Sequence, residues 1–187
     1  MREETEHGEV LTHEYIPDYQ SLTETDEPLI NCTIWEKGHI ARNLLPNKIL
    51  VFILSGSICV TLDTGTQYII GSDCMIYVPA DCYYKLEVLE KARCLQFCLN
   101  GHTSIYACSP DGYNKCRHDV KHIPDNNKYI LNIKPILQPF IDMLLMYIQS
   151  GIDCRQLYQV KIQELFYILN TTYSKQELSF FFYHDAR

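Results

Sequence analysis

The chain has 187 residues, of which 47% are hydrophobic, so it can bury a substantial core and is not disordered by composition. Its formal net charge of -7 comes from 16 Lys and Arg against 23 Asp and Glu. An acidic chain repels phosphate backbones, which argues against nucleic-acid binding by this chain alone.

The first segment, residues 1–27, is polar and acidic and predicts an N-terminal arm. Its start, MREETEHGEV, carries charges where a signal peptide needs an apolar core. No apolar run reaches the roughly 18–20 residues of a membrane span. Most of the nine cysteines lie in apolar runs, as reduced, buried thiols do. We therefore expect a cytoplasmic protein with no membrane contact.

Residues 28–130 are predicted to form a β-barrel domain. Short apolar runs are joined by turn formers with no helix between them, a pattern typical of an antiparallel sandwich or barrel. Residues 48–54 and 57–63 flank Ser55-Gly56-Ser57 and predict a hairpin. Several runs are apolar at consecutive positions, which indicates strands covered on both faces, or an interior pocket with a helix outside. The expected strands cover 29–36, 48–54, 57–63, 67–70, 74–79, 83–89 and 93–99.

The stretch 102–129 is rich in turn formers and predicts a long loop. Cys108, Cys116, His118 and His122 are its candidate zinc ligands, since zinc takes thiolate and imidazole groups. The Cys pair lacks the tight spacing of structural zinc sites, and the two His share a face only on a helix. Polar loop residues are the simpler interpretation, and we expect no metal.

Residues 131–187 change to helical spacing and predict a helical segment. Pro135 suits the first turn of the first helix, whereas Pro139 must also lie in that turn or kink the helix. Gly151 is expected to end it, and Asp153 to cap the next helix. The apolar positions of this first helix are Ile136, Leu137, Phe140, Ile141, Leu144, Leu145 and Ile148.

The second and third helices carry apolar stripes of their own. Ser174 and Glu177 have the spacing of a capping box that starts the third helix. The aromatic run 180–183 should pack on its own domain or on a continuation absent here, and we expect a fragment of a longer protein. In the second helix, four side chains could face a partner helix in a homodimer, or else pack on the barrel: Ile162, Leu165, Phe166 and Leu169.

The segment GSDCMIYVPADCYYK resembles the cupin outline, which implies a double-stranded β-helix, or jelly roll, followed here by antiparallel helices. Cupin enzymes usually place a metal-binding histidine five residues after the proline, where this chain has Tyr84. Their other motif needs two histidines and a glutamate before Gly56, and NLLPNKILVFILSG has none of these. The resemblance therefore implies a cupin with no catalytic metal, no cofactor and no enzymatic activity.

The tail from 131 to 184 resembles the linker region of AraC-type transcription regulators, especially those of Bacteroides-like bacteria. The matching features are a helix ending in YIQSG, KIQELFYIL, a YSKQEL restart and the phenylalanine run. In that family a cupin-like domain senses a ligand, the helices dimerise, and two helix-turn-helix units bind DNA. Those units would begin after Arg187. The resemblance implies a non-catalytic sensing and dimerisation domain that reaches DNA only through a domain absent from this chain.

Candidate ligand-binding residues are Trp35, Arg42 and Tyr84, because an aromatic wall with one guanidinium suits a sugar or a carboxylate effector. A core Trp, a surface Arg and a turn Tyr are the simpler interpretation. Two other functions stay open. One is a metal-free cupin enzyme such as a sugar epimerase or isomerase, although residues 48–99 hold no histidine to act as its acid or base. The other is a structural dimer module with a filled barrel.

Overall fold

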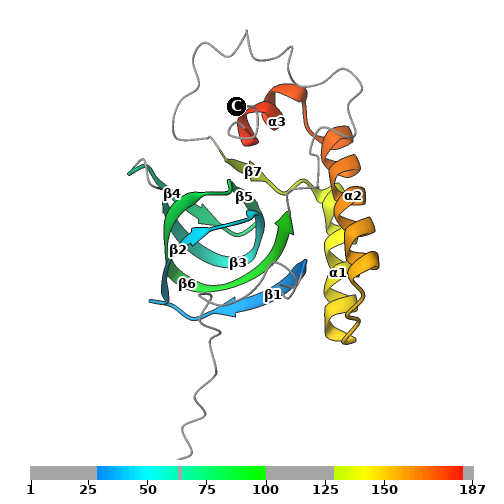
Figure 1. The fold of residues 1–187 in the computed structure, drawn as a ribbon, viewed down its shortest axis with the longest axis horizontal. Coiled ribbons are helices and arrows are strands. Elements are labelled where there is room, and N and C mark those ends of the chain that lie inside the picture. Colours follow the sequence, from blue (N-terminus) through cyan, green and yellow to red (C-terminus); the bar gives the residue numbers. More distant parts are fainter. Residues whose placement is uncertain (1–28, 63–64, 100–128, 183–187) are drawn as a thin grey trace, which may run out of the picture.

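The computed structural model describes residues 29–62, 65–99 and 129–182 (Figure 1). Within these ranges seven strands precede three α-helices, and a short 3-10 turn, Pro135–Leu137, leads into the first helix. The predicted arm at 1–27 lies outside the described residues. The strands are β1 (Ile30–Trp35), β2 (Ile40–Leu45), β3 (Lys48–Leu62), β4 (Gln67–Gly71), β5 (Cys74–Val78), β6 (Cys82–Leu99) and β7 (Ile130–Asn132).

Two long antiparallel strands, β3 and β6, form the centre of the sheet and pair with each other from end to end. The free edge of β6 pairs with β1 along one part and with β2 along the other. The free edge of β3 is divided in the same way between β5 and β4. We call β1, β5, β7 and the adjoining parts of β3 and β6 the helix-side half, and β2, β4 and the remainder the far half.

The bend that separates these halves lies at Gly56. The β3–β6 register shifts between Ile53 and Ile58, and Gly56 has φ 77°. A Cβ atom at this glycine would overlap the carbonyl group of Lys91 and lie 2.8 Å from Ala92 Cα. The predicted hairpin at residues 55–57 is therefore wrong. The chain bulges and bends within one strand, because β6 continues as its partner on both sides of the bend.

The neighbouring strands bend at the same level. Gly38 has φ 82°, its amide donates to the Val88 carbonyl over 2.8 Å, and the Val88 amide donates to the His39 carbonyl over 2.9 Å. This is a glycine bulge, and it lets β1 and β2 follow the same edge of β6. On the opposite edge, Asp73 lies in the short connection between β4 and β5 and has φ 61°.

Because the bends are aligned, the sheet rolls over and its two halves face each other (Figure 1). Mainly β structure, rolled as a cupin-like double-stranded β-helix and followed by helices, is the fold class that the sequence predicts. Strand β7 extends this sheet by pairing with β5, so the predicted domain boundary after residue 130 falls inside a strand.

Burial differs between the halves. In the far half of β3, Ile58, Val60 and Leu62 are buried and alternate with more exposed side chains, so one face points inward. In the helix-side half, residues 50–53 are all at most 6% exposed. This half is covered on both faces, as its consecutive apolar positions predict, with helices on the outside.

The helices are α1 (Gln138–Gln149), α2 (Arg155–Thr172) and α3 (Lys175–Phe181). Pro139 lies in the first turn of α1, and Gly151 follows its end with φ 67°. The predicted cap at Asp153 is wrong: the N-cap of α2 is Cys154, whose side chain makes no capping bond. The capping box of α3 forms as predicted. No helix among the described residues is long and apolar enough to cross a membrane.

Replacing Gly56 by Ala should prevent the close approach of β3 to β6. We expect a loss of more than about 3 kcal/mol in unfolding free energy, because backbone atoms must move in addition to the left-handed strain of about 1 kcal/mol. Gly65→Ala is the matched control, since Gly65 has φ 79° but open space around its Cα. Urea denaturation measures both variants, and equal losses would contradict the packing argument.

Candidate functional site

The interior of the roll is apolar and filled. Apolar side chains that share a face with Ile53 in one half, and those that share a face with Ile58 in the other, belong to one buried hydrophobic cluster. The most deeply buried of these inward-facing side chains are at most 2% exposed, which leaves no water-sized space beside them. Among the described residues no polar or charged side chain is classed as buried. The inward-facing residues at most 2% exposed include Ile53, Ile58, Val60, Ile70, Ile76, Val88 and Cys94.

The thiol of Cys94 is a titratable group of this interior with a strongly raised pKa. Burial, with a smaller contribution from the neighbouring Cys32, raises the pKa of Cys94 to about 12. A thiol with this pKa stays protonated at neutral pH and is a poor nucleophile. The centre of the roll therefore presents a hydrophobic filling rather than reactive groups.

The three predicted ligand-binding residues do not come together. Tyr84 lies opposite Leu62 and is half-buried on the inward face, whereas Arg42 lies opposite Lys85 and is exposed on the outer face. Trp35 is half-buried opposite Ala92, close to the bend. Arg42 thus cannot complete an inward-facing site with the two aromatic residues in this arrangement. Ligand binding by Trp35 and Tyr84 stays a prediction.

Within 29–62, 65–99 and 129–182, no three His, Cys, Asp or Glu side chains are placed to hold a metal ion. Cys108, Cys116, His118 and His122 lie outside the described residues.

The stripe offered to a partner helix is covered by the chain itself. Ile162, Leu165, Phe166 and Leu169 are between 0 and 3% exposed within one chain. This burial shows that the stripe is covered within one chain, and homodimerisation stays a prediction.

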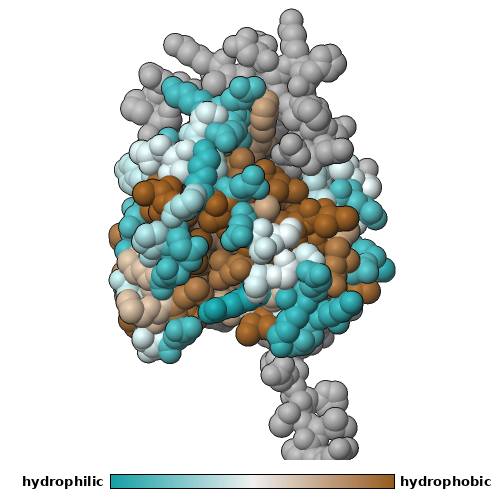
Figure 2. Space-filling view, turned by 180° about the vertical axis from the view of Figure 1, so that it is seen from behind, coloured by the Kyte–Doolittle hydropathy of each residue, from teal (hydrophilic) through white to brown (hydrophobic). Residues whose placement is uncertain are grey.

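The opposite side of α2 faces solvent. Val160 is 57% exposed and Tyr167 is 59% exposed, and they lie two turns apart. The exposed residues in line with them carry no charge: Gln156, Gln163 and Thr171. Figure 2 shows apolar atoms gathered across the middle of the rear face but interrupted by hydrophilic ones, so this view alone singles out no docking patch.

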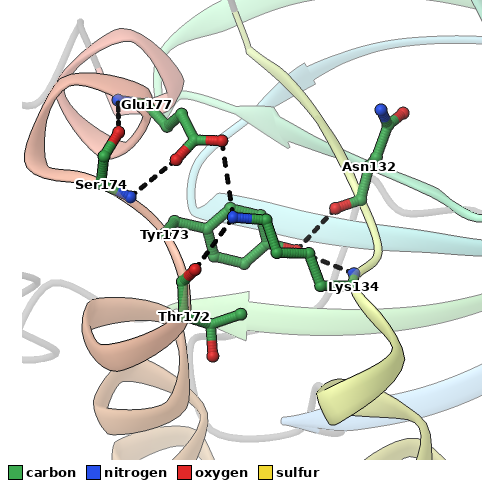
Figure 3. A network of polar contacts seen from close by, with 6 residues as sticks. All are labelled: Asn132, Lys134, Thr172, Tyr173, Ser174 and Glu177. Carbon is green, nitrogen blue, oxygen red and sulfur yellow. Dashed lines mark hydrogen bonds and ion pairs between the residues drawn. The ribbon is translucent and has the colours of Figure 1, made fainter.

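A polar network joins the sheet to the helices where β7 ends (Figure 3). The hydroxyl of Tyr173 donates to the Asn132 carbonyl over 2.6 Å and accepts from the Lys134 amide over 3.1 Å. The Tyr173 hydroxyl thus satisfies one backbone carbonyl and one backbone amide at the end of β7, as a neighbouring strand would. We call Lys134, Tyr173, Ser174 and Glu177, with the Asn132 and Thr172 carbonyls, the Lys134 node.

The ammonium group of Lys134 joins the two helices. It donates to the Thr172 carbonyl at the end of α2 over 2.9 Å and lies 3.6 Å from the Glu177 carboxylate in α3. It also lies 4.2 Å from the centre of the Tyr173 ring. A cation is favoured here by the negative end of the α2 dipole, the carboxylate and the aromatic face.

The titration of the node reflects these contacts. Burial raises the pKa of Tyr173, the bond from the Lys134 amide partly offsets this, and the nearby Glu177 raises it further. Bonds from the backbone and side chain of Ser174 lower the pKa of Glu177, and Lys134 adds to that effect. At neutral pH the node thus contains a neutral phenol and an ionised carboxylate.

An aromatic cluster lies beside the node and gives the C-terminal phenylalanines their partners. Tyr77, from β5, is 5.0 Å from Phe182 and 6.0 Å from Phe181 between ring centroids. Phe166 of α2 lies 6.0 Å from Phe182. The aromatic tail therefore packs on its own domain. The capping box could be predicted from the spacing of Ser174 and Glu177. The contacts of Lys134 and Tyr77 join residues far apart in the sequence, so no local pattern predicts them.

Comparisons with known proteins give a partial likeness. No protein-family model matches the chain, and no curated protein matches it. A conserved Streptococcus pyogenes protein of unknown function has 27% identity and TM-score 0.36; the match covers 37% of this chain and 61% of that chain.

Two further solved structures carry cupin titles. A cupin superfamily protein from Desulfitobacterium hafniense has 20% identity and TM-score 0.37, with coverage of 42% of this chain and 72% of that chain. An RmlC-like cupin with a double-stranded β-helix fold from Methanocaldococcus jannaschii has 14% identity and TM-score 0.34. The match covers 37% of this chain and 68% of that chain. With scores this low, the fold assignment depends on the strand pairing described above.

Removing the Tyr173 hydroxyl should destabilise the protein. Tyr173→Phe leaves the Asn132 carbonyl and the Lys134 amide without this partner, and we expect a loss of about 1–3 kcal/mol. Tyr167→Phe is the control, because its side chain is 59% exposed and should change stability little. Urea denaturation at pH 7 compares the two, and equal midpoints would refute the bridging role.

Proposed function

We propose that this chain is the effector-sensing and dimerisation region of an AraC-type transcription regulator and acts without catalysis in the cytoplasm. The observation that carries the proposal is the attachment of the helices to one half of the roll through β5, β7 and the Lys134 node. A change in the roll would thereby reach the helices. The likeness of residues 131–184 to the linker of that family and the seven free thiols of the described residues support it.

The effector is proposed to be a small sugar or carboxylate bound at the rim of the roll. Trp35 and Tyr84 are inward-facing and half-buried, so they are aromatic positions that a small molecule could contact at the edge of the packed centre. Binding there would favour one of two arrangements of roll and helices, to the extent that the effector binds one more tightly. In this proposal the contact with DNA is not made by the residues that the structure describes.

The partner is proposed to be a second copy of the chain, paired through the exposed side of α2. The line from Gln156 to Thr171 has no charge, so two copies of a chain with net charge -7 can approach there with little repulsion. Val160 and Tyr167 would supply the apolar contact in a two-fold interface.

A structural dimer module is the second candidate, and the filled interior of the roll favours it. In that case the roll would bind no effector and would serve only to hold α2 in position for dimerisation. The metal-free isomerase is less well supported, because it needs a positioned acid and base and no carboxylate, imidazole or amine is buried among the described residues.

A sensor should be stabilised by its effector. In a thermal-shift screen of sugars and small carboxylates, an effector at 100 times its Kd should add about 2.7 kcal/mol, which appears as a rise of several degrees in Tm. The same compound should change the fluorescence of Trp35, the only tryptophan. A complete screen without a hit would favour the structural module.

The dimer is tested by light scattering at several protein concentrations. The unmodified chain should be a dimer, and Tyr167→Lys should be monomeric at the same concentration because it brings two cations together at the interface. Met146→Lys on α1 is the control, since Met146 is also 55% exposed but lies on another helix. A monomeric unmodified chain at high concentration would overturn this part of the proposal.

A further inference from the structure

The last helix depends on its surroundings for stability. Helix α3 has seven residues, fewer than the roughly 12–15 that an isolated helix needs even to be marginally stable in water. Its internal support is the capping box, in which the Glu177 amide donates to the Ser174 hydroxyl over 3.2 Å and the Ser174 amide donates to the Glu177 carboxylate over 2.6 Å. The remaining support must come from contacts with β5, β7, α2 and Lys134.

Two kinds of contact hold α3 in place. The apolar contact places Phe181 and Phe182 on Tyr77, whose side chain is 0% exposed in the assembled chain. The polar contact is the pair between Lys134 and Glu177, whose side chains are 39% and 42% exposed. Water and salt compete for such a half-exposed pair, so it is the weaker of the two.

The position of Lys134 allows this weaker contact to influence how firmly α3 is held. Its ammonium group bonds the last carbonyl of α2 and faces the first turn of α3, so it spans the joint between them. Tyr173 remains attached to the Asn132 carbonyl through its own hydroxyl. Loss of the Lys134 charge would therefore loosen α3 while leaving β7 attached to the end of α2.

We propose that α3 is a releasable cap over Tyr77, a built-in switch between a docked and a released state whose balance is set by the charge of Lys134. Release breaks the Lys134–Glu177 pair and uncovers the aromatic faces of Tyr77 and Phe166, while the roll, α1 and α2 stay folded. As the output step of a sensor this switch rests on the function proposed above. Its opening can be measured without an effector, so the two proposals can fail separately.

Native-state hydrogen exchange at pH 7 tests the switch, with mass-spectrometric readout of the peptide that covers 175–182. Lys134→Met keeps the aliphatic stem and removes the charge. We expect exchange in this peptide to rise about fivefold, the effect of losing one half-exposed ion pair, while peptides covering 48–53 and 94–99 are unchanged. Lys134→Arg keeps the charge and should stay near the unmodified rate.

The matched control is Lys161→Met. Lys161 also pairs with a carboxylate, Glu164 at 2.7 Å, but lies near the middle of α2. It should leave the exchange of 175–182 unchanged. The proposal is overturned if Lys134→Met and Lys161→Met affect this peptide equally. It is also overturned if the strand peptides accelerate by the same factor, because α3 would then open only when the whole chain unfolds.

Discussion

The close approach of the β3 and β6 backbones at Gly56 is the constraint on which the architecture depends. A side chain at this position has no room beside the Lys91 carbonyl, and the backbone has a positive φ. The bulge lets one strand serve both halves of the roll while it stays paired with the same partner. Without it the sheet would not roll over, and the inward-facing sides of its two halves would not meet.

The halves produced by this bend have different roles. The far half has one buried face and one open face, whereas the helix-side half is buried on both faces and supports all three helices. Because Tyr77 and β7 belong to that half, the helices are extensions of the sheet rather than a separate unit. Because the helices continue the sheet and the interior is packed, we infer that binding takes place at the rim of the roll and on the helices.

Much of the fold could be predicted from the sequence because its signals are local. Apolar runs, turn residues and the Ser174–Glu177 spacing indicate strands and helices by themselves. The bend could not be predicted, since Ser55-Gly56-Ser57 suits a hairpin as well as a bulge, and the difference lies in how β6 pairs beyond it. Arg42 and Tyr84 fall on opposite faces through strand register, which one sequence does not reveal. Lys134 and Tyr173 meet only through the tertiary fold.

The central claim is that the roll, α1 and α2 share one core and unfold together. Trp35, the only tryptophan, lies on β1 and reports on the roll, while circular dichroism at about 222 nm reports chiefly on α1 and α2. Urea unfolding followed by both signals on the same sample should give one coincident transition. Loss of the helical signal at clearly lower urea, with tryptophan fluorescence unchanged, would contradict the account.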